Sequence, residues 1–368
     1  TRPGMLHAVI VRARTPRGTI RHFDATAARA LPGVHDILGP GDAPAKTRLF
    51  GKEILYLGQP VAAVCADSLA DAERAARAIV IHYDRLPFAS TFDEAAAPNA
   101  PLVKPAGNFA PQSPVVMERG DVAAGLAAAD VVITREFRTP VQLHTALEPH
   151  GACAEWEGER LTVWESTQGI FRTRNDVARA LDLPQSKVRV IKNYMGGGFG
   201  AKNGAGAHTF VAALFAKRVN RAVRCLNDRE AEQVDSGNRP ATVQRVTIGA
   251  KKNGTLTAIQ LSADIPLGIS GWEGGPAQIY HELYACPNVR SEERFAYINA
   301  SGMQAFRGPG YVEGAFGLEG AMNVLATALG MDPLALRRKN FAKKDPRQGR
   351  TYSGNALLEC YAQGAERF

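Results

Sequence analysis

The chain has 368 residues, which is enough for two domains of ordinary size. With 45% hydrophobic and 22% charged residues, and no apolar run near the ~20 residues of a membrane span, the sequence excludes a disordered or membrane-spanning protein. The basic residues behind the net charge of +8 are dispersed along the sequence and do not alternate with aromatic residues, which argues against a nucleic-acid groove. The excess of positive charge favours a subunit interface or an anionic ligand.

We predict a small domain over residues 1–100. Alternating apolar residues indicate strands at 7–12 and 57–65. A helix is expected over 68–79, because Ser68 is a favourable N-cap and the apolar residues after it recur at helical spacing. A strand at 79–83 completes a mixture typical of a small α+β domain. Residues 101–128 are assigned as a linker, since this part of the chain is rich in Ala, Pro and Asn.

The second predicted domain spans residues 129–368. Lys252-Asn253-Gly254 is typical of a hairpin turn between two strands. Two glycine-rich loops are expected at 196–206 and 302–314. Strands are expected at 130–137, 160–165, 187–194, 222–227, 241–248 and 255–261, and helices at 173–183, 208–219 and 315–329.

The five cysteines lie far apart, and none forms a C-x-x-C pair. We therefore expect no iron–sulfur cluster or zinc ribbon within this chain. The N-terminus does not resemble a signal peptide, because Pro3-Gly4 precedes only a brief apolar stretch. We expect the cysteines to be buried, reduced thiols, which are typical of a reducing compartment such as the cytoplasm. The periplasm is the alternative if the chain is exported with a partner.

The segment Met195-Gly-Gly-Gly-Phe-Gly-Ala-Lys-Asn203 is the most informative of the sequence. Consecutive glycines cost backbone entropy, so their presence between a strand and a helix indicates that something approaches the backbone closely. Successive N–H groups in such a loop can bind an anion. The other interpretation is a tight turn that packs the strand on the helix.

Two known nucleotide-binding loops can be compared with this segment. A Walker A loop requires glycine and Ser/Thr where Ala201 and Asn203 stand, so that interpretation fails. A Rossmann loop fits the spacing of Gly196, Gly198 and Ala201, although the first suitably placed acid, Asp228, lies further along than usual. A Rossmann-type NAD(P) dehydrogenase therefore stays as an alternative, and it predicts one continuous parallel sheet.

Several segments, in order, resemble the xanthine dehydrogenase/aldehyde oxidase family of molybdenum hydroxylases. The pattern M-G-G-G-F-G-x-K of the loop resembles the segment that lies against the molybdenum centre. The resemblance covers nearly the whole chain and implies an α+β fold with mixed sheets, in which a small α/β hammerhead domain is followed by the first of two molybdenum-cofactor-binding domains. The other matching segments are Pro3–Ala8, Leu57–Ala62, Gln142–His150, Trp164–Gln168, Ala305–Gly310 and Met331–Asn340.

The resemblance also implies roles for particular residues. Gln142 matches a glutamine whose amide faces an oxo ligand of molybdenum. Phe199 and Gly200, with Gly197 and Gly198, match backbone that passes close to the metal ligands. Arg307 matches an arginine whose backbone N–H faces the centre. No side chain of this chain is expected to ligate the metal directly.

The implied cofactor is molybdopterin with molybdenum, in the cytosine dinucleotide form. Iron–sulfur clusters and FAD are expected on partner subunits, and the general base and further pterin contacts on a second molybdenum-binding domain beyond this chain. An exposed apolar surface of ~1,000 Å² or more is expected where that domain docks. A non-catalytic chain that only scaffolds its partners is the second alternative.

The expected substrate is an aldehyde or an N-heteroaromatic compound that is hydroxylated with oxygen from water. Xanthine-oxidising relatives carry a glutamate where Asn203 stands, an arginine near Gly275 and an aromatic residue at Pro309, so the resemblance implies a substrate other than xanthine. Asn203 and Pro309 are the expected substrate-pocket residues. The second loop also lacks the cysteine of carbon monoxide-oxidising relatives.

Overall fold

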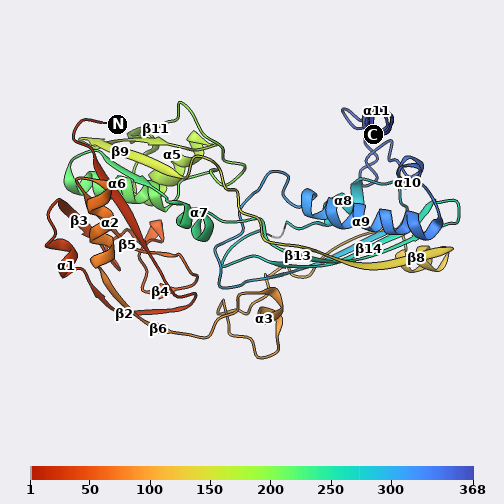
Figure 1. The fold of residues 1–368 in the computed structure, drawn as a ribbon, viewed down its shortest axis with the longest axis horizontal. Helices are drawn as coiled ribbons and strands as arrows, with labels where there is room; N and C mark the ends of the chain where they lie inside the picture. The colour runs from red at the N-terminus through yellow and green to blue at the C-terminus, as the bar shows by residue number, and fades with distance from the viewer. Residues whose placement is uncertain (1, 273) are drawn as a thin grey trace.

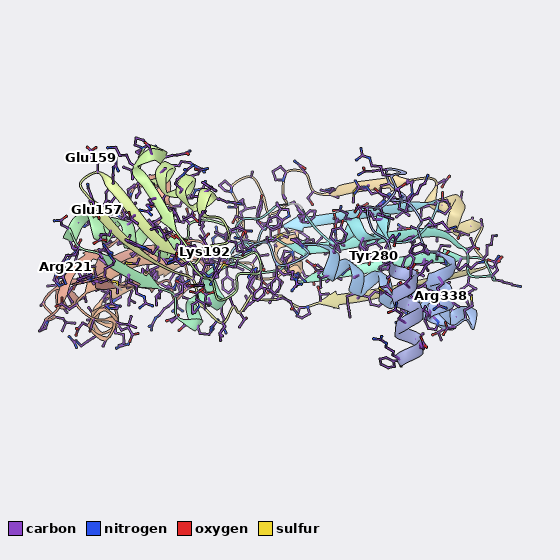
Figure 2. The ribbon with its side chains drawn as sticks, turned by 90° about the horizontal axis from the view of Figure 1, so that it is seen from above. Glu157, Glu159, Lys192, Arg221, Tyr280 and Arg338 are labelled. Atoms are coloured by element: carbon purple, nitrogen blue, oxygen red, sulfur yellow. The ribbon has the colours of Figure 1, made fainter. Side chains whose placement is uncertain are left out.

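The computed structural model describes residues 2–272 and 274–368. The chain forms two lobes side by side along its longest axis (Figure 1). The first lobe contains a seven-stranded and a three-stranded sheet, and the second contains a five-stranded sheet. In Figure 2, Glu157 and Arg221 mark the first lobe and Tyr280 marks the second. Lys192, which precedes the glycine-rich segment 195–203, lies toward the junction between the lobes.

The N-terminal residues form the outer part of the first lobe. The helix predicted at 68–79 is confirmed as α2 (Leu69–Ala78), and the Ser68 hydroxyl accepts from the Asp71 N–H at 3.1 Å, as an N-cap should. This helix packs on β1 and β5 through Ala72 and Ala75. The elements are β1 (Leu6–Arg12), β2 (Gly18–Asp24), α1 (Thr26–Arg29), β3 (Val34–Leu38), β4 (Glu53–Ile54), β5 (Pro60–Ala66), α2 and β6 (Val80–Arg85).

The same lobe is completed by residues from the second half of the sequence. The seven-stranded sheet has the order β11-β10-β9-β12-β1-β5-β3, so β1 pairs in parallel with β12 across more than two hundred residues of chain. Helix α6 covers β9 and β12, and its buried Val211 and Phe215 belong to the core of this lobe. The added elements are β9 (Gly151–Glu157), β10 (Arg160–Glu165), α5 (Ile170–Ala180), β11 (Val188–Ile191), α6 (Ala207–Val219), β12 (Val223–Leu226) and α7 (Arg229–Asp235).

The second lobe is a five-stranded sheet of order β7-β15-β14-β13-β8, and α8 and α9 cover one of its faces (Figure 1). The expected hairpin at Lys252-Asn253-Gly254 is confirmed between β13 and β14, and the α+β fold with mixed sheets is confirmed as well. The elements are β7 (Val115–Arg119), α4 (Val122–Ala127), β8 (Val131–Thr139), β13 (Thr242–Ala250), β14 (Leu256–Pro266), α8 (Ala277–Glu282), β15 (Val289–Ala296), α9 (Tyr311–Leu329), α10 (Pro333–Lys339) and α11 (Leu357–Arg367).

The segment expected to be a linker, residues 101–128, contributes regular structure to the second lobe. Strand β7 pairs with β15, and α4 packs on β13 and β14. Ahead of them, α3 (Phe92–Ala96) and the chain after it bury Phe92 and Val103 against Ile298. Side-chain packing against a distant strand has thus overridden a composition that, read locally, is typical of a linker.

Two residues of one matching segment, Asp332 and Asn340, hold the fold together at the far end of the second lobe. Asp332 caps α10 by accepting from the Ala335 N–H at 2.7 Å. Asn340, 3% exposed, donates to the carbonyl groups of Gly254 and Leu336 and accepts from the Leu256 N–H. The Met331–Asn340 match therefore fixes the β13–β14 turn against α10.

Candidate cofactor-binding site

The glycine loop, defined here as residues 195–203, lies between β11 and α6 on the side of the first lobe that faces the second. Three of its residues have left-handed backbone: Gly197 at φ +98°, Phe199 at 52° and Gly200 at +111°. A Cβ atom on Gly200 would lie 2.2 Å from the carbonyl oxygen of Ala305. Glycine is therefore required here both by conformation and by the close approach of the second loop.

Gln168 holds the middle of the glycine loop. Its Oε1 accepts from the Gly200 N–H at 2.8 Å and the Lys202 N–H at 3.3 Å, and its own N–H donates to the Lys202 carbonyl at 2.7 Å. A Cβ on Gly198 would lie 2.5 Å from that Oε1. The end of the Trp164–Gln168 stretch is therefore part of the site.

Lys202 and Glu148 hold the two ends of the glycine loop. Lys202 Nζ donates to the Glu148 carbonyl at 2.7 Å and to Ser166 Oγ at 2.8 Å, and lies 3.4 Å from Glu148 Oε2. That carboxylate oxygen also accepts from the Gly196 N–H at 2.7 Å. Burial alone would raise the pKa of Glu148, but the hydrogen bonds from Ser166 and Gly196 and the charge of Lys202 lower it.

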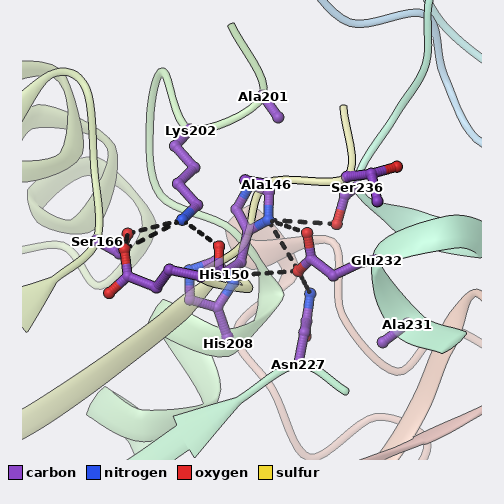
Figure 3. A network of polar contacts seen from close by, with 12 residues as sticks. Ala146, His150, Ser166, Ala201, Lys202, His208, Asn227, Ala231, Glu232 and Ser236 are labelled. Atoms are coloured by element: carbon purple, nitrogen blue, oxygen red, sulfur yellow. Dashed lines mark hydrogen bonds and ion pairs between the residues drawn. The ribbon is translucent and has the colours of Figure 1, made fainter. Parts of the chain in front are cut away.

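A second polar cluster lies behind the loop. Figure 3 shows Lys202 and Ser166 on one side and His150, Glu232, Asn227 and Ser236 on the other. Glu232 accepts from the His150 backbone at 2.8 Å and its side-chain oxygens lie 2.9 Å from His150 Nδ1. Although burial acts against ionisation, the contacts with His150 and Asn227 lower the pKa of Glu232 to about 2. These hydrogen bonds fix the end of the 142–150 segment to α7.

The second loop, defined here as residues 305–310, is placed by two buried side chains. The His144 ring stacks on Phe306 at 4.5 Å between centroids, and the Arg239 guanidinium lies 4.6 Å from the same ring. Arg239 Nη2 donates to the Phe306 carbonyl at 3.0 Å and the Arg307 carbonyl at 2.7 Å. Burial lowers the pKa of His144, so its neutral ring donates from Nε2 to the Ala305 carbonyl at 2.7 Å.

The two loops meet directly. The Arg307 N–H donates to the Phe199 carbonyl at 2.9 Å, and Gly200 packs on Ala305. The N–H of Arg307, expected to face a bound centre, is instead taken up in joining the loops. In the part of the chain that the structure describes, the N–H groups of Gly197, Gly198 and Phe199 donate to no protein acceptor. The Phe199 side chain, next to these donors, is 43% exposed.

Other expected site residues lie at the edges of this arrangement. Gln142 is exposed, and its backbone pairs with Arg239 rather than with the glycine loop. Asn203 lines a polar cavity of about 210 Å³ with Arg172, His208 and Gln304, whereas Pro309 is exposed and does not line that cavity. The structure thus brings Phe199, Gly200 and Arg307 together, but it does not bring Asn203 and Pro309 into one pocket.

The sheet topology and the position of Lys202 exclude both nucleotide-binding interpretations of the loop. The seven-stranded sheet is mixed: β1 is parallel to β12 but antiparallel to β5, and β9 is antiparallel to both its neighbours. The Rossmann alternative, which required one continuous parallel sheet, is therefore wrong. The enclosed ammonium of Lys202 also could not reach a phosphate as a Walker A lysine does.

Comparison with known proteins shows the family to which the chain belongs. The family model described as the molybdopterin cofactor-binding domain matches residues 106–341, and that of the aldehyde oxidase and xanthine dehydrogenase a/b hammerhead domain matches residues 1–87. The chain therefore belongs to the aldehyde oxidase and xanthine dehydrogenase family of molybdopterin cofactor-binding proteins. The expected order, a hammerhead domain and then a cofactor-binding domain, is confirmed.

Two relatives illustrate the likeness in sequence. The aldehyde oxidoreductase molybdenum-binding subunit PaoC of Escherichia coli (strain K12) is 34% identical over 100% of this chain and 50% of its own length. The nicotinate dehydrogenase large molybdopterin subunit of Eubacterium barkeri is 32% identical over 92% of this chain and 83% of its own length. The chain thus spans about half of the first relative and most of the second.

Solved structures give the same result. The aldehyde oxidoreductase from Desulfovibrio gigas has a TM-score of 0.91 and 27% identity over 100% of this chain and 43% of its own. Quinoline 2-oxidoreductase from Pseudomonas putida 86, with a TM-score of 0.92 and 22% identity over 100% of this chain and 51% of its own, shares the fold.

Within residues 2–272 and 274–368, no helix is long and apolar enough to cross a membrane. Among the same residues, no group of three or more His, Cys, Asp or Glu could hold a metal ion.

Proposed function

We propose that the chain is the first cofactor-binding half of the catalytic subunit of a molybdenum hydroxylase. The observation that carries this proposal is the pair of joined loops with three free backbone donors, from Gly197 to Phe199, on an exposed edge. A row of backbone N–H groups suits the anionic oxygen and sulfur atoms of molybdopterin, so the residues present fit that group. When bound, the cofactor would supply the two-electron oxidation of the substrate carbon.

This chain's own residues would bind and orient the cofactor. The free N–H groups of Gly197, Gly198 and Phe199 would donate to it, and the Phe199 ring would cover one side. Gln168 fixes the backbone that carries these donors, because its Oε1 accepts from the N–H groups of Gly200 and Lys202. We therefore assign to Gln168 the site position that the sequence resemblance gave to Gln142.

The proposed substrates are aldehydes or N-heteroaromatic compounds other than xanthine. The names of the two relatives, an aldehyde oxidoreductase subunit and a nicotinate dehydrogenase subunit, support both classes. The neutral Asn203 amide in its polar cavity and the small Pro309 on the second loop support the exclusion of purines. Water would be the source of the oxygen.

We further propose that a second molybdenum-binding domain, on this or another polypeptide, covers the loops. Leu147 and Tyr194 are 90% and 91% exposed, and they lie close together because the Glu148 N–H donates to the Gly196 carbonyl. Phe171, at the start of α5, is 66% exposed. Large apolar side chains around a polar loop are typical of an interface. An iron–sulfur subunit, a flavin subunit, the cytosine dinucleotide form and a cytoplasmic location complete the proposal.

Turnover with isotopically labelled water tests this function. The protein, purified with the subunits that accompany it, is supplied with an artificial electron acceptor and a panel of aldehydes, pyridine and quinoline carboxylates, and xanthine. We expect ¹⁸O from water in the product of an aldehyde or N-heteroaromatic substrate and none from xanthine. Bound molybdenum without turnover of any panel member would favour a non-catalytic scaffold, and rapid oxidation of xanthine would contradict the substrate assignment.

A further inference from the structure

The ammonium group of Lys202 joins the segments that build one side of the site. Its three acceptors come from the 142–150 segment and the 164–168 stretch, while its own backbone belongs to the glycine loop. The Lys202 side chain is 0% exposed, whereas that of Glu148 is 44% exposed. The lysine is therefore enclosed, and its ammonium group contacts protein acceptors.

Burying this charge is costly, which indicates that it serves a purpose other than packing. Burial lowers the pKa of Lys202, and the charge of Glu148 acts in the opposite direction. An apolar side chain of similar length would fill the same space without the desolvation penalty. The ammonium, however, can hold a carbonyl, a hydroxyl and a carboxylate at fixed distances from one another, which an apolar side chain cannot.

Those fixed groups reach both ends of the glycine loop. At the first end, Glu148 Oε2 accepts from the Gly196 N–H at 2.7 Å and from Ser166 Oγ at 2.6 Å. At the other end, the Lys202 carbonyl accepts from the Gln168 N–H and from Thr167 Oγ1 at 3.1 Å. Between these ends, Gln168 holds the Gly200 N–H and Arg307 donates to the Phe199 carbonyl, while the N–H groups of Gly197, Gly198 and Phe199 donate to no protein acceptor in the part of the chain described.

We propose that Lys202 is a positioning residue that sets the direction of the free N–H groups of the glycine loop. Through Glu148 it holds the backbone at Gly196, and through its own main chain it meets Gln168. The inference rests on the proposed function, since the N–H groups matter when a cofactor lies against them. Lys202 itself does not touch the reacting atoms.

The test replaces Lys202 with Met in the protein purified with its accompanying subunits. We expect amide hydrogen exchange of the 195–203 peptide to rise by ~10-fold or more, because the loop loses its fixed ends. We expect kcat to fall by roughly 10–100-fold while KM stays within about threefold, since misplaced groups weaken the reaction more than substrate binding. Retained molybdenum is measured for both proteins.

The matched control is Lys187→Met. Lys187 pairs with Glu159 at 3.1 Å, but the two side chains are 38% and 83% exposed. Exposed pairs contribute little to stability, so this variant should leave exchange and turnover unchanged. If Lys202→Met does not fold, Glu148→Gln serves instead: it keeps the shape, weakens the contact with Lys202 and should raise exchange of the same peptide.

The outcomes separate this proposal from the proposed function. Unchanged exchange in the 195–203 peptide of Lys202→Met overturns the positioning role, even if turnover falls. Raised exchange with unchanged kcat overturns it as well. If the wild-type protein holds no molybdenum, the proposed function fails. In that case raised exchange of the 195–203 peptide alone would leave Lys202 a structural residue and overturn its role toward a cofactor.

Discussion

Gly200 occupies a position at which even one methyl group should separate the two loops of the site. The added Cβ would lie 2.2 Å from the Ala305 carbonyl oxygen, and the backbone is left-handed at φ +111°. We expect Gly200→Ala to lower the free energy of unfolding by roughly 2–3 kcal/mol and the molybdenum content by ~10-fold or more. Urea denaturation and elemental analysis measure the two effects.

Gly158 provides the control, since it is also left-handed, at φ +59°, but a Cβ there would meet no atom within 4 Å. Gly158→Ala should cost at most ~1–2 kcal/mol and leave the molybdenum content unchanged. Equal molybdenum contents in the Gly200 and Gly158 variants would show that close contact between the loops is not needed for cofactor binding.

Glu293 should make stability depend on pH. Burial raises its pKa to about 7, although the Ala277 N–H donates to its Oε1 at 2.9 Å. Because the folded protein holds this proton more tightly than the unfolded chain, stability should fall as pH rises from about 4.5 to about 7. Glu293→Gln should remove this dependence and raise the free energy of unfolding at pH 8 by roughly 2–3 kcal/mol. If the free energy of unfolding changed with pH in the same way for both proteins between pH 5 and 8, Glu293 would not be the cause of the pH dependence.

The glycine loop could be predicted from the sequence, because three consecutive glycines between a strand and a helix are rarely needed for packing alone. The resemblance nominated Gln142, whereas it is the Gln168 side chain that accepts from the Gly200 and Lys202 N–H groups of the loop. Both stand in segments that match the family, and nothing local distinguishes a side chain that meets the loop from one that points to solvent. The Thr-Gln-Gly order at 167–169 was the available signal, since a polar side chain just before a helix can reach backbone groups of a neighbouring loop. Lys202, Arg239 and His144 were missed as positioning residues because the partners of their side chains lie 36 to 161 residues away along the chain.

At the scale of elements, β1 connects the N-terminal region to the site. It lies between β12 and β5, with Leu6 opposite Val223 and Ala8 opposite Cys225. Because β12 begins just after α6, which follows the glycine loop, disturbing β1 should reach the site. We expect Leu6→Ala, at a fully buried position, to cost ~2–4 kcal/mol and to raise amide exchange in β12 as well as β1. Exchange that rises only within residues 1–100 would instead show an independent N-terminal domain.

Sequence patterns predicted most strands of the seven-stranded sheet but not the order of those strands. They also assigned residues 101–128 to a linker, whereas these residues form β7 and α4 of the second lobe. Alternation identifies a strand but not its neighbour, and β1 finds its parallel partner far along the chain. Strand β15 was missed because two of its inward residues, Ser291 and Glu293, are polar, so apolar and polar residues do not alternate along it. Its inward residues, among them Val289 and Phe295, are recognisable only once β14 and β7 are known to flank it.

At the scale of the whole molecule, the exposed apolar side chains around the glycine loop should bind a second domain. We expect Leu147→Ser combined with Tyr194→Ser to leave the stability of this chain unchanged, since both side chains are almost fully exposed. Association with the co-purifying molybdenum subunit, or hydrogen-exchange protection at the contact if both domains share one chain, should weaken by ~10-fold or more. Val80→Ser, at a 45% exposed position on β6, is the control and should have no effect.

The molybdenum and pterin content of the protein, purified from its native host with all accompanying subunits, tests the central claim most directly. The joined loops, with their free N–H groups at Gly197, Gly198 and Phe199, predict about one molybdenum and one pterin per chain. They also predict a loss of both in Gly200→Ala but not in Gly158→Ala. Wild-type protein that holds neither molybdenum nor pterin, with its partner subunits present, would contradict the assignment of this site to a molybdenum hydroxylase.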